Sequence, residues 1–354
     1  MAKAEAIAAR PDFPWLDIER PEGIWRFLAQ RGWVLADERL VRCEKAGDGN
    51  MNLTVRVWTD RRSVILKQAR PWVEKYEHIA ASPDRAVVEE RFYRRVASIP
   101  GVASRMPKLL AADATACALL LEDLCGARDL TAMYRGETLD DDDLRRLASY
   151  LRVLHTSTTG DPDPHFANRA MRALNHEHIF RVPLDPAARL DLDRFEAGLA
   201  AAARHIQAHK DFAARVAETG KRYLADGRCL VHGDFFPGSW LNGTAANRND
   251  AIWVIDPEFC FHGDAELDVG CAVAHLALGR QELASARSFV EFYSQGDQTK
   301  LDGAWVGRYA AVEVMRRLIG VAQLPIVFSS PFRVKLLERA RSAMLDENWE
   351  RLWS

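Results

Sequence analysis

Two short apolar runs in the second half of the chain each lead directly into carboxylates. The first ends at His232-Gly-Asp234, and the second ends at Asp256-Pro-Glu258. Short apolar runs bounded by glycine and proline are typical of buried strands. The loop after such a strand holds its side chains at the rim of a core. If the two strands lie side by side, the carboxylate of Asp234 comes close to those of Asp256 and Glu258.

Phosphoryl transfer is a reaction that needs carboxylates in such an arrangement. One carboxylate accepts the proton of the attacking hydroxyl, and others hold magnesium on the nucleotide phosphates. Magnesium prefers one or two carboxylates together with phosphates and water, which suits the pair Asp256 and Glu258. Either motif alone is equally typical of a turn or a strand end. The two motifs together, in this order and behind apolar runs, favour the catalytic interpretation.

The pattern of the whole chain predicts an α+β fold with two lobes. Residues 52–58 alternate apolar and polar side chains, residues 63–68 and 118–121 are also strand-like, and residues 84–97 have helical spacing. From Asp140 onward the pattern is mostly helical, apart from the two short strands. A strand-rich part followed by a helical part is typical of α+β folds. We therefore expect an N-terminal nucleotide-binding lobe over residues 1–121 and a C-terminal catalytic and substrate lobe over residues 122–354.

The first lobe carries residues that suit a nucleotide. Gly47-Asp48-Gly49-Asn50 lies between two expected strands, where glycines let backbone N–H groups approach phosphates. Most such turns are plain hairpins, so this motif alone is weak. Lys67 lies within the expected strand 63–68, and Glu89 lies on the following helix. A strand lysine held by a helix glutamate is the arrangement by which kinases bind the α- and β-phosphates.

Several other classes of protein are disfavoured by the sequence. No P-loop, Rossmann, H-E-x-x-H or G-x-S-x-G motif occurs. His232, His262, Asp264 and Glu266 could form the metal centre of a hydrolase, but that interpretation leaves the features of the first lobe unexplained. The 48 basic residues nearly balance the 50 acidic ones, so the chain lacks the basic excess that is typical of proteins that bind nucleic acid.

The same sequence predicts a cytoplasmic protein without a membrane partner. The N-terminal residues include no apolar core of the length found in signal peptides, and no run of about 18 apolar residues occurs. The six cysteines form no C-x-x-C pair, and we expect them to be reduced thiols.

These motifs resemble those of the aminoglycoside phosphotransferase and choline kinase superfamily, and within it those of the 5-methylthioribose kinases. The loop H-G-D-L-H-T-G-S of these kinases corresponds to H-G-D-F-F-P-G-S at residues 232–239. Their strand V-I-D-P-E-F-A-F-Y-G corresponds to V-I-D-P-E-F-C-F-H-G at residues 254–263. Their segments D-G-N-L-N, K-Q-A-x-P and M-R-R-I-x-G correspond to residues 48–52, 67–71 and 315–320. The matches therefore cover most of the chain.

The resemblance implies a protein-kinase-like fold with a strand-rich first lobe and a mostly helical second lobe. It implies that ATP binds between the lobes, with the adenine near Glu122 to Leu124, and that a small-molecule sugar is the second substrate. It also implies a homodimer and a place in methionine salvage.

The resemblance assigns roles in catalysis as well. Asp234 would be the catalytic base at the anomeric hydroxyl of the sugar, and it would bind that substrate together with Arg316 and Arg317. The side chains that would bind Mg²⁺ are those of Asp256 and Glu258, with Ser239 at the position of the usual metal-binding asparagine. The residues that would support the catalytic loop are His232 and Asp268.

Three residues near the expected substrate depart from the pattern of the 5-methylthioribose kinases. Phe236 replaces a histidine, Pro237 replaces a threonine, and Trp240 adds bulk beside the same loop. A related 5-modified ribose or another small alcohol therefore stays open as the substrate. An aminoglycoside phosphotransferase is one alternative, although paired arginines would repel a polycation. A pseudokinase that binds nucleotide without catalysis is the other, and the complete set of lysine and carboxylates argues against it.

Overall fold

The computed structural model describes residues 3–47, 49, 51–188, 190–245, 248–296 and 300–354. The chain divides into two compact units. Unit 1 comprises Met1–Ala127 and Gly243–Ala251, and unit 2 comprises Arg128–Asn242 and Ile252–Ser354. The lobe boundary that the sequence suggests, between residues 121 and 122, stays a prediction.

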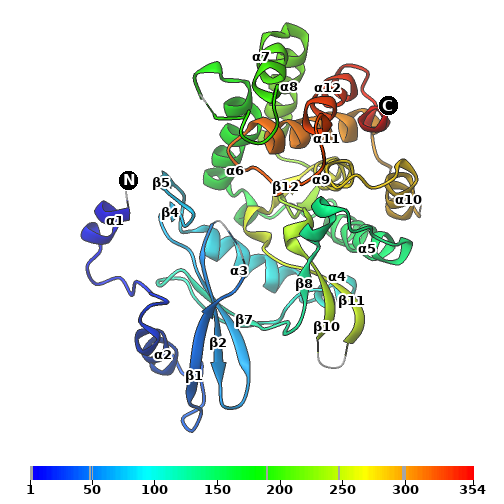
Figure 1. Ribbon diagram of the computed structural model, residues 1–354. Helices are drawn as coiled ribbons and strands as arrows, with labels where there is room; N and C mark the ends of the chain where they lie inside the picture. The colour runs from blue at the N-terminus through cyan, green and yellow to red at the C-terminus, as the bar shows by residue number, and fades with distance from the viewer. Residues whose placement is uncertain (1–2, 48, 50, 189, 246–247, 297–299) are drawn as a thin grey trace. The chain divides into compact units, whose positions relative to one another are not determined.

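An antiparallel sheet forms the centre of unit 1, with the strand order β1-β2-β3-β7-β6 (Figure 1). Its strands are β1 (Leu40–Lys45), β2 (Leu53–Thr59), β3 (Ser63–Gln68), β6 (Leu109–Asp113) and β7 (Ala118–Glu122). Val57 and Leu66 pack in one core cluster with Phe27 of helix α2 (Pro21–Gln30). Because successive side chains of a strand point to opposite faces, Lys67 lies on the face of β3 opposite to Leu66.

Helix α3 (Arg85–Val96) contacts β6 and β7 and carries Glu89 among its buried residues. The expectation of a helix over residues 84–97 is confirmed. The shorter elements of unit 1 are α1 (Lys3–Ala9), β4 (Trp72–Val73), β5 (Tyr76–Ala80) and α4 (Pro100–Ala103).

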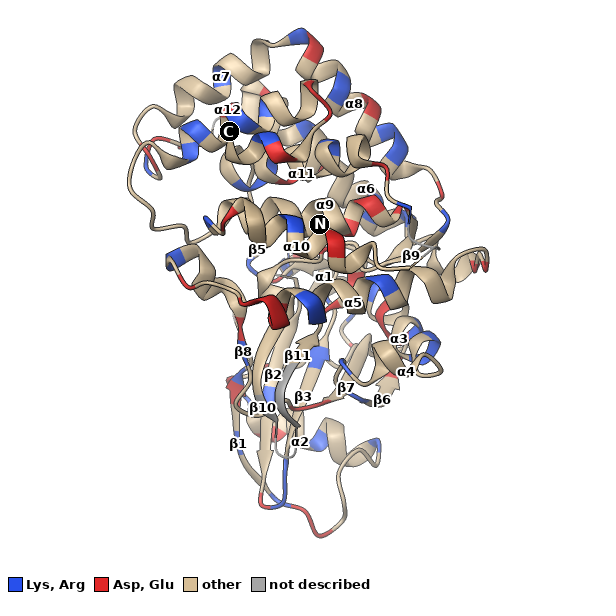
Figure 2. Cartoon of the chain, turned by 90° about the vertical axis from the view of Figure 1, so that its right-hand side faces the viewer, with Lys and Arg blue, Asp and Glu red and all other residues tan. Residues whose placement is uncertain are grey.

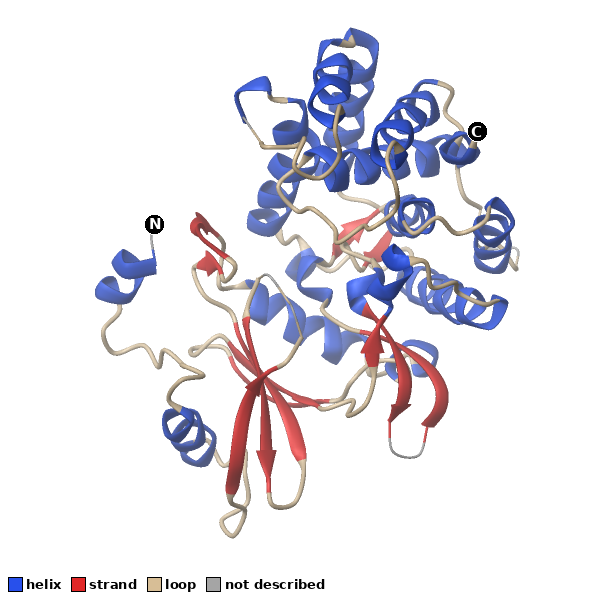
Figure 3. Cartoon of the chain, viewed as in Figure 1, coloured by secondary structure: helices blue, strands red, loops and turns tan. Residues whose placement is uncertain are grey.

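Unit 2 is mostly helical (Figure 3). Its helices are α5 (Asp141–Thr158), α6 (Arg169–His176), α7 (Leu199–Ala208), α8 (Lys210–Leu224), α9 (Ala265–Leu278), α10 (Leu283–Tyr293), α11 (Gly303–Ile319) and α12 (Phe332–Leu345). Helices α9 and α11 pack against each other and are buried along most of their length. Because nearly every residue from Val306 to Ile319 and from Val269 to Leu278 is buried, these two helices form the centre of unit 2, and the charged residues that they carry are buried with them.

Helix α5 shows how local sequence determines an element of unit 2. The carboxylate of Asp140 accepts a hydrogen bond from the backbone N–H of Asp143, which caps the first turn. Leu144, Leu147 and Leu151 recur at helical spacing and are buried. The helix expected to open at Asp140 is therefore confirmed.

In the described part of the chain, the two short strands in front of the carboxylates belong to different sheets, so direct pairing of these strands is not what brings the two acidic motifs together. β9 (Cys229–Val231) pairs with β12 (Phe261–Gly263). β11 (Arg248–Val254) is bonded to β10 (Trp240–Ala245), which also pairs with β8 (Arg128–Asp129). The three residues of β12 are too few for their periodicity to reveal a strand.

Acidic and basic residues are interspersed in both units (Figure 2), in keeping with a net charge of −2. Among the helices that the structure describes, none combines the length and the apolar character needed to cross a membrane.

Candidate active site

The loop that follows β9 carries Asp234 at the edge of the core of unit 2. Gly233 adopts a left-handed conformation with φ of +83°, and a Cβ atom there would lie 2.3 Å from the carbonyl oxygen of Phe259. Only glycine fits such a close approach of two backbones without strain. The side chain of Asp234 itself is 21% exposed, so it borders the core and remains within reach of a ligand.

Asp268, in the first turn of α9, holds this loop by its backbone. Its Oδ2 atom accepts a hydrogen bond of 2.7 Å from the N–H of His232, and its Oδ1 atom accepts one of 3.0 Å from the N–H of Gly233. On the far side, His155 Nε2 lies 3.1 Å from Asp268 Oδ2, and Tyr293 Oη lies 2.9 Å from His155 Nδ1. A buried carboxylate with several donors is a strong anchor, so Asp268 fixes the backbone that carries Asp234.

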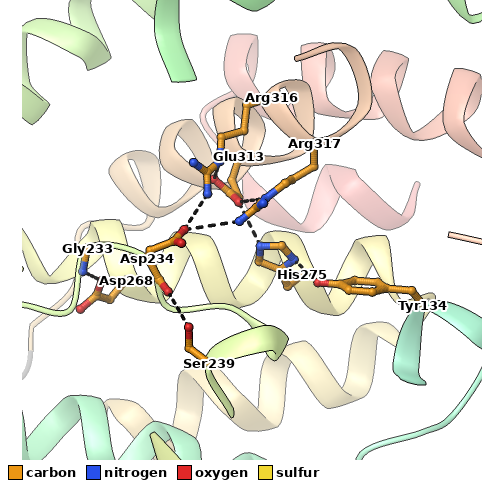
Figure 4. Close-up of polar contacts among 9 residues, drawn as sticks. All are labelled: Tyr134, Gly233, Asp234, Ser239, Asp268, His275, Glu313, Arg316 and Arg317. Atoms are coloured by element: carbon orange, nitrogen blue, oxygen red, sulfur yellow. Dashed lines mark hydrogen bonds and ion pairs between the residues drawn. The ribbon is translucent and has the colours of Figure 1, made fainter. Parts of the chain in front are cut away.

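Two arginines hold the side chain of Asp234. Arg316 Nη2 lies 2.7 Å and Arg317 Nη2 lies 3.4 Å from Asp234 Oδ1 (Figure 4). Glu313, one turn earlier on α11, pairs with Arg316 Nε at 2.6 Å and with Arg317 Nε at 2.8 Å. Residues three and four apart lie on the same side of a helix, so the sequence places these three side chains together.

The side chain of Glu313 is charged in this environment. Burial raises the pKa of the Glu313 carboxyl, but the guanidinium groups of Arg316 and Arg317 and the hydrogen bond from His275 outweigh burial and hold the pKa well below its usual value. Two guanidinium groups and two carboxylates, those of Asp234 and Glu313, thus meet at one place.

The segment with Asp256 and Glu258 lies directly against the Asp234 loop. His232 Nε2 donates a hydrogen bond of 2.9 Å to the carbonyl of Ile255, and the N–H of Ile255 donates one of 3.0 Å to the carbonyl of Ser239. Asp256 has a left-handed backbone with φ of +62°, and Glu258 is 4% exposed. Carboxylate oxygens are hard ligands of the kind that magnesium prefers, so the chemistry of these two side chains would fit a magnesium ion.

Ser239 is the third expected metal ligand. Its hydroxyl donates a hydrogen bond of 3.4 Å to the backbone carbonyl of Asp234 (Figure 4), and the residue is buried. Its hydroxyl is therefore part of the same loop as the expected base, and metal ligation by Ser239 stays a prediction.

The expected phosphate-binding pair is formed in unit 1. Lys67 Nζ lies 2.7 Å from Glu89 Oε2, and the side chains are only 4% and 1% exposed. A buried lysine needs such a partner, so Glu89 fixes the position of the Lys67 ammonium group. The pair that the strand and helix patterns predict is therefore present.

The other expected nucleotide residues lie at two places in unit 1. Gly47 is exposed with φ of +71°, and Gly49 is exposed as well. Asp48 and Asn50, expected in the same turn, lie outside the described residues. At the end of β7, Glu122 Oε2 accepts a hydrogen bond of 3.1 Å from the N–H of Lys108, and Leu124 is buried.

Several residues of this site were missed by the sequence reasoning. Asn168 Nδ2 donates hydrogen bonds of 3.0 Å to the carbonyls of both Glu258 and Cys260 and so holds the expected metal segment. Its only sequence signal is its place in a loop after an aspartate- and proline-rich stretch. A histidine on an apolar helix face is usually an ordinary core residue, so the patterns of α5 and α9 gave no reason to select His155 or His275.

Comparison with known proteins places the chain among phosphotransferases. The model of the phosphotransferase enzyme family matches residues 42–303. A methylthioribose kinase of Exiguobacterium sibiricum is 29% identical over 247 residues, which are 67% of this chain and 61% of that protein. A methylthioribose kinase of Bacillus cereus is 24% identical over 352 residues, or 85% of each chain. One of Cronobacter sakazakii is 26% identical over 91% of this chain and 76% of its own length.

Solved structures show the same fold at lower sequence identity. The choline kinase LicA of Streptococcus pneumoniae has a TM-score of 0.54 at 14% identity, over 93% of this chain and 99% of its own. An amicoumacin kinase in complex with AMP-PNP, Ca²⁺ and its second ligand has a TM-score of 0.52 at 15% identity, over 91% and 93%. The expected α+β fold of the protein-kinase-like phosphotransferases is confirmed.

Proposed function

Since the chain belongs to the phosphotransferase enzyme family, we propose that it transfers the γ-phosphoryl group of ATP to the anomeric hydroxyl of 5-methylthioribose or a closely related 5-modified ribose. It is a phosphotransferase that acts on an alcohol group, and ATP is its co-substrate. The finer assignment of the sugar is supported by the methylthioribose kinases among its relatives. That sugar would place the reaction in methionine salvage.

The observation that carries the proposal is the arrangement around Asp234. Its carboxylate is fixed through the backbone by Asp268 and through Oδ1 by two arginines. A fixed carboxylate at a partly open position is what a general base for a hydroxyl requires. Both arginines bind the same oxygen, so Oδ2 is the atom that takes the proton of the sugar hydroxyl in this proposal.

The remaining residues of the proposal bind ATP and its metal. Lys67, held by Glu89, contacts the phosphates, and the nucleotide also binds at the Gly47 turn and near Glu122 and Leu124. Asp256 and Glu258 hold Mg²⁺, with the hydroxyl of Ser239 as a further oxygen. When bound, the metal neutralises the charge of the phosphates. Orientation and charge neutralisation then supply most of the rate enhancement.

The charges of the site argue against an aminoglycoside as the acceptor. The guanidinium groups of Arg316 and Arg317 flank the proposed base, and a substrate with several ammonium groups would meet them at short range. Two positive and two negative side chains balance there, which suits a neutral polyol.

The test is an acceptor panel with Mg²⁺ and ATP, in which ADP release and the mass of each product are measured. The panel contains 5-methylthioribose, 5-deoxyribose, ribose, choline, homoserine and kanamycin. We expect one added phosphate on 5-methylthioribose at the lowest KM of the panel. Phosphorylation of choline or kanamycin instead would contradict the proposed substrate. Binding of ATP without turnover of any alcohol would favour the pseudokinase interpretation.

The homodimer implied by the resemblance is tested by the mass of the protein in solution.

A further inference from the structure

A chain of hydrogen bonds runs inward from the arginine pair. His275 on α9 places Nε2 2.9 Å from Glu313 Oε1, and Tyr134 places its hydroxyl 2.7 Å from His275 Nδ1 (Figure 4). Tyr134 belongs to the short 3₁₀ helix Leu130–Arg135. This chain thus joins three separate elements of unit 2, and all three side chains are buried.

Only one placement of protons satisfies this chain. The carboxylate of Glu313 is charged and can only accept, so His275 Nε2 carries a hydrogen and donates it. Burial lowers the pKa of His275 to about 4 against the opposing influence of Glu313, so the neutral ring leaves Nδ1 as an acceptor. Burial also raises the pKa of the Tyr134 hydroxyl well above its usual value, so this hydroxyl keeps its proton and donates to Nδ1. Tyr134 therefore selects the tautomer of His275 that binds Glu313.

Glu313 in turn orients the guanidinium groups of Arg316 and Arg317 relative to Asp234. It accepts a hydrogen bond from Arg317 Nε and forms an ion pair with Arg316, whose Nε lies 2.6 Å from Glu313 Oε2, while an Nη2 atom of each arginine lies against Asp234 Oδ1. A guanidinium group is a rigid planar fork, so fixing one edge fixes the direction of the other. Without the charge of Glu313, two cations would compete for the single carboxylate of Asp234.

Phe236 closes the same network from the side of the catalytic loop. The guanidinium carbon of Arg317 lies 4.7 Å from the centre of the Phe236 ring, and this ring lies 5.6 Å from that of His275. The phenylalanine that departs from the pattern of related kinases thus packs on Arg317 and His275.

A metal centre is the competing explanation, because Cys271, His275 and Glu313 offer three ligand atoms within 4.8 Å of one another. The neighbouring charges speak against it. Both oxygens of Glu313 are already paired with guanidinium groups, and the Nε2 atom of His275 that faces Glu313 carries a hydrogen. Burial raises the pKa of the Cys271 thiol well above its usual value, which disfavours the thiolate that binds metals.

We propose that Glu313, His275 and Tyr134 are positioning residues, which hold Arg316 and Arg317 in the orientation that fixes Asp234 for catalysis. The proposal rests on the proposed function, in which Asp234 is the base. It adds that the base is oriented from two positions along α9, by Asp268 through the backbone and by His275 through Glu313 and the arginines.

The first experiment compares Glu313→Gln with a matched control, Glu347→Gln. Glu347 is also a carboxylate that pairs with two arginines, Arg308 and Arg215, but it makes no contact with Asp234 in the described structure. We expect Glu313→Gln to lower kcat about 100-fold and to raise KM for the sugar, while the Kd of ATP changes less than about twofold. We expect Glu347→Gln to behave as wild type. Loss of folded protein would lower the apparent kcat without changing the KM of the sugar or of ATP. A change in both kcat and the KM of the sugar therefore distinguishes a positioning role of Glu313 from an effect on folding alone.

The second experiment keeps the proposal testable if Glu313→Gln does not fold or if no acceptor is turned over. Nuclear magnetic resonance of ¹⁵N-histidine-labelled wild-type protein reports which ring nitrogen of His275 is protonated. We expect a neutral ring with hydrogen on Nε2 at pH 7, and a fall in kcat of about fivefold in Tyr134→Phe, which corresponds to one hydrogen bond. Hydrogen on Nδ1, or kinetic constants of Glu313→Gln equal to those of Glu347→Gln, would overturn the proposal. A wild-type enzyme that is inactive on every acceptor, with the expected His275 tautomer, would overturn the proposed function and leave the network intact.

Discussion

Single residues with unusual backbone conformations mark the catalytic loop and the segment beside it. Gly233 and Asp256 both have positive φ, +83° and +62°. For Asp256 this conformation has a cost, because only glycine and, to a lesser degree, aspartate and asparagine adopt it readily. Such strain persists only where the surrounding structure imposes it, and it is concentrated at functional sites. This backbone conformation occurs at Asp256, the residue with which the proposed metal segment begins.

Asp256→Asn tests this residue without disturbing its backbone, because asparagine tolerates the same conformation. We expect kcat to fall by on the order of 100-fold or more, since a neutral amide replaces a metal-binding charge. The melting temperature of the protein without ligands should stay near that of wild type, while its rise on addition of Mg²⁺ and ATP should shrink. Wild-type kcat at saturating Mg²⁺ would show that Asp256 is not a ligand.

At the scale of elements, α9 is the helix that organises the site. Asp268 and His275 are seven residues apart on it, and so they lie near the same face two turns apart. Asp268 binds the backbone of the Asp234 loop, and His275 binds Glu313 of α11. Asp268 and Glu313 are each bonded to a histidine that is itself bonded to a tyrosine. Asp268 contacts His155, which contacts Tyr293, and Glu313 contacts His275, which contacts Tyr134. One buried helix, α9, therefore fixes the position of both the Asp234 loop and the arginine pair.

Asp268→Asn tests the backbone anchor. An asparagine of the same size offers one oxygen instead of two, so a buried N–H of the loop loses its acceptor at a cost of about 1–3 kcal/mol. We expect both a lower melting temperature and a fall in kcat of at least about tenfold.

The matched control for Asp268→Asn is Glu196→Gln. Glu196 is buried and accepts hydrogen bonds from the N–H groups of Arg333 and Val334 at the start of α12. We expect it to lower stability to a similar degree with an unchanged kcat. Equal losses of kcat in the two variants would show that Asp268 acts only on stability.

At the scale of the whole molecule, the two units carry different parts of the proposed reaction. Unit 1 holds the buried Lys67–Glu89 pair, and unit 2 holds the base, the arginine pair and the proposed metal segment.

Stability also depends on charged groups that lie outside the proposed site. In unit 1, burial raises the pKa of Glu38, but hydrogen bonds from Arg62, the N–H of Leu35 and Thr59 outweigh burial and lower the pKa to about 2.

The lowered pKa of Glu38 predicts how acid affects unit 1. A carboxyl group with a depressed pKa in the folded state contributes stability above its unfolded pKa of 4.5, and this contribution is lost as the pH falls towards 2. Because Arg62 is 41% exposed and its charge is screened by solvent, the contribution is on the order of 1–3 kcal/mol. We expect Glu38→Gln to lower the melting temperature at pH 7 and to lose most of this difference near pH 2. In the control Asp37→Asn, an exposed ion pair with Arg61 is removed, and little change is expected at either pH. If the difference in melting temperature between wild type and Glu38→Gln were the same across the pH range, the lowered pKa of Glu38 would be contradicted.

The elements and the acidic motifs were predictable because they depend on local patterns. The strands and helices with strong periodicity, such as residues 63–68 and α5, formed where expected. The spacing of Glu313, Arg316 and Arg317 already places them on one helix face. The pairing of β9 with β12 was not predictable, because it joins two very short strands across a long connection. The partners of His155 and His275 could not be predicted either, because they lie far away in the sequence.

The central claim is that Asp234 is the base for phosphoryl transfer from ATP to a 5-modified ribose. The most direct test uses γ-labelled ATP with Mg²⁺ and 5-methylthioribose, and compares the labelled products of wild type and Asp234→Asn. We expect wild type to label the sugar, and we expect Asp234→Asn to bind ATP with nearly unchanged affinity while its turnover falls about 10²- to 10⁴-fold. A wild-type enzyme that leaves the sugar unlabelled, or an Asp234→Asn variant that still labels it at the wild-type rate, would contradict the claim.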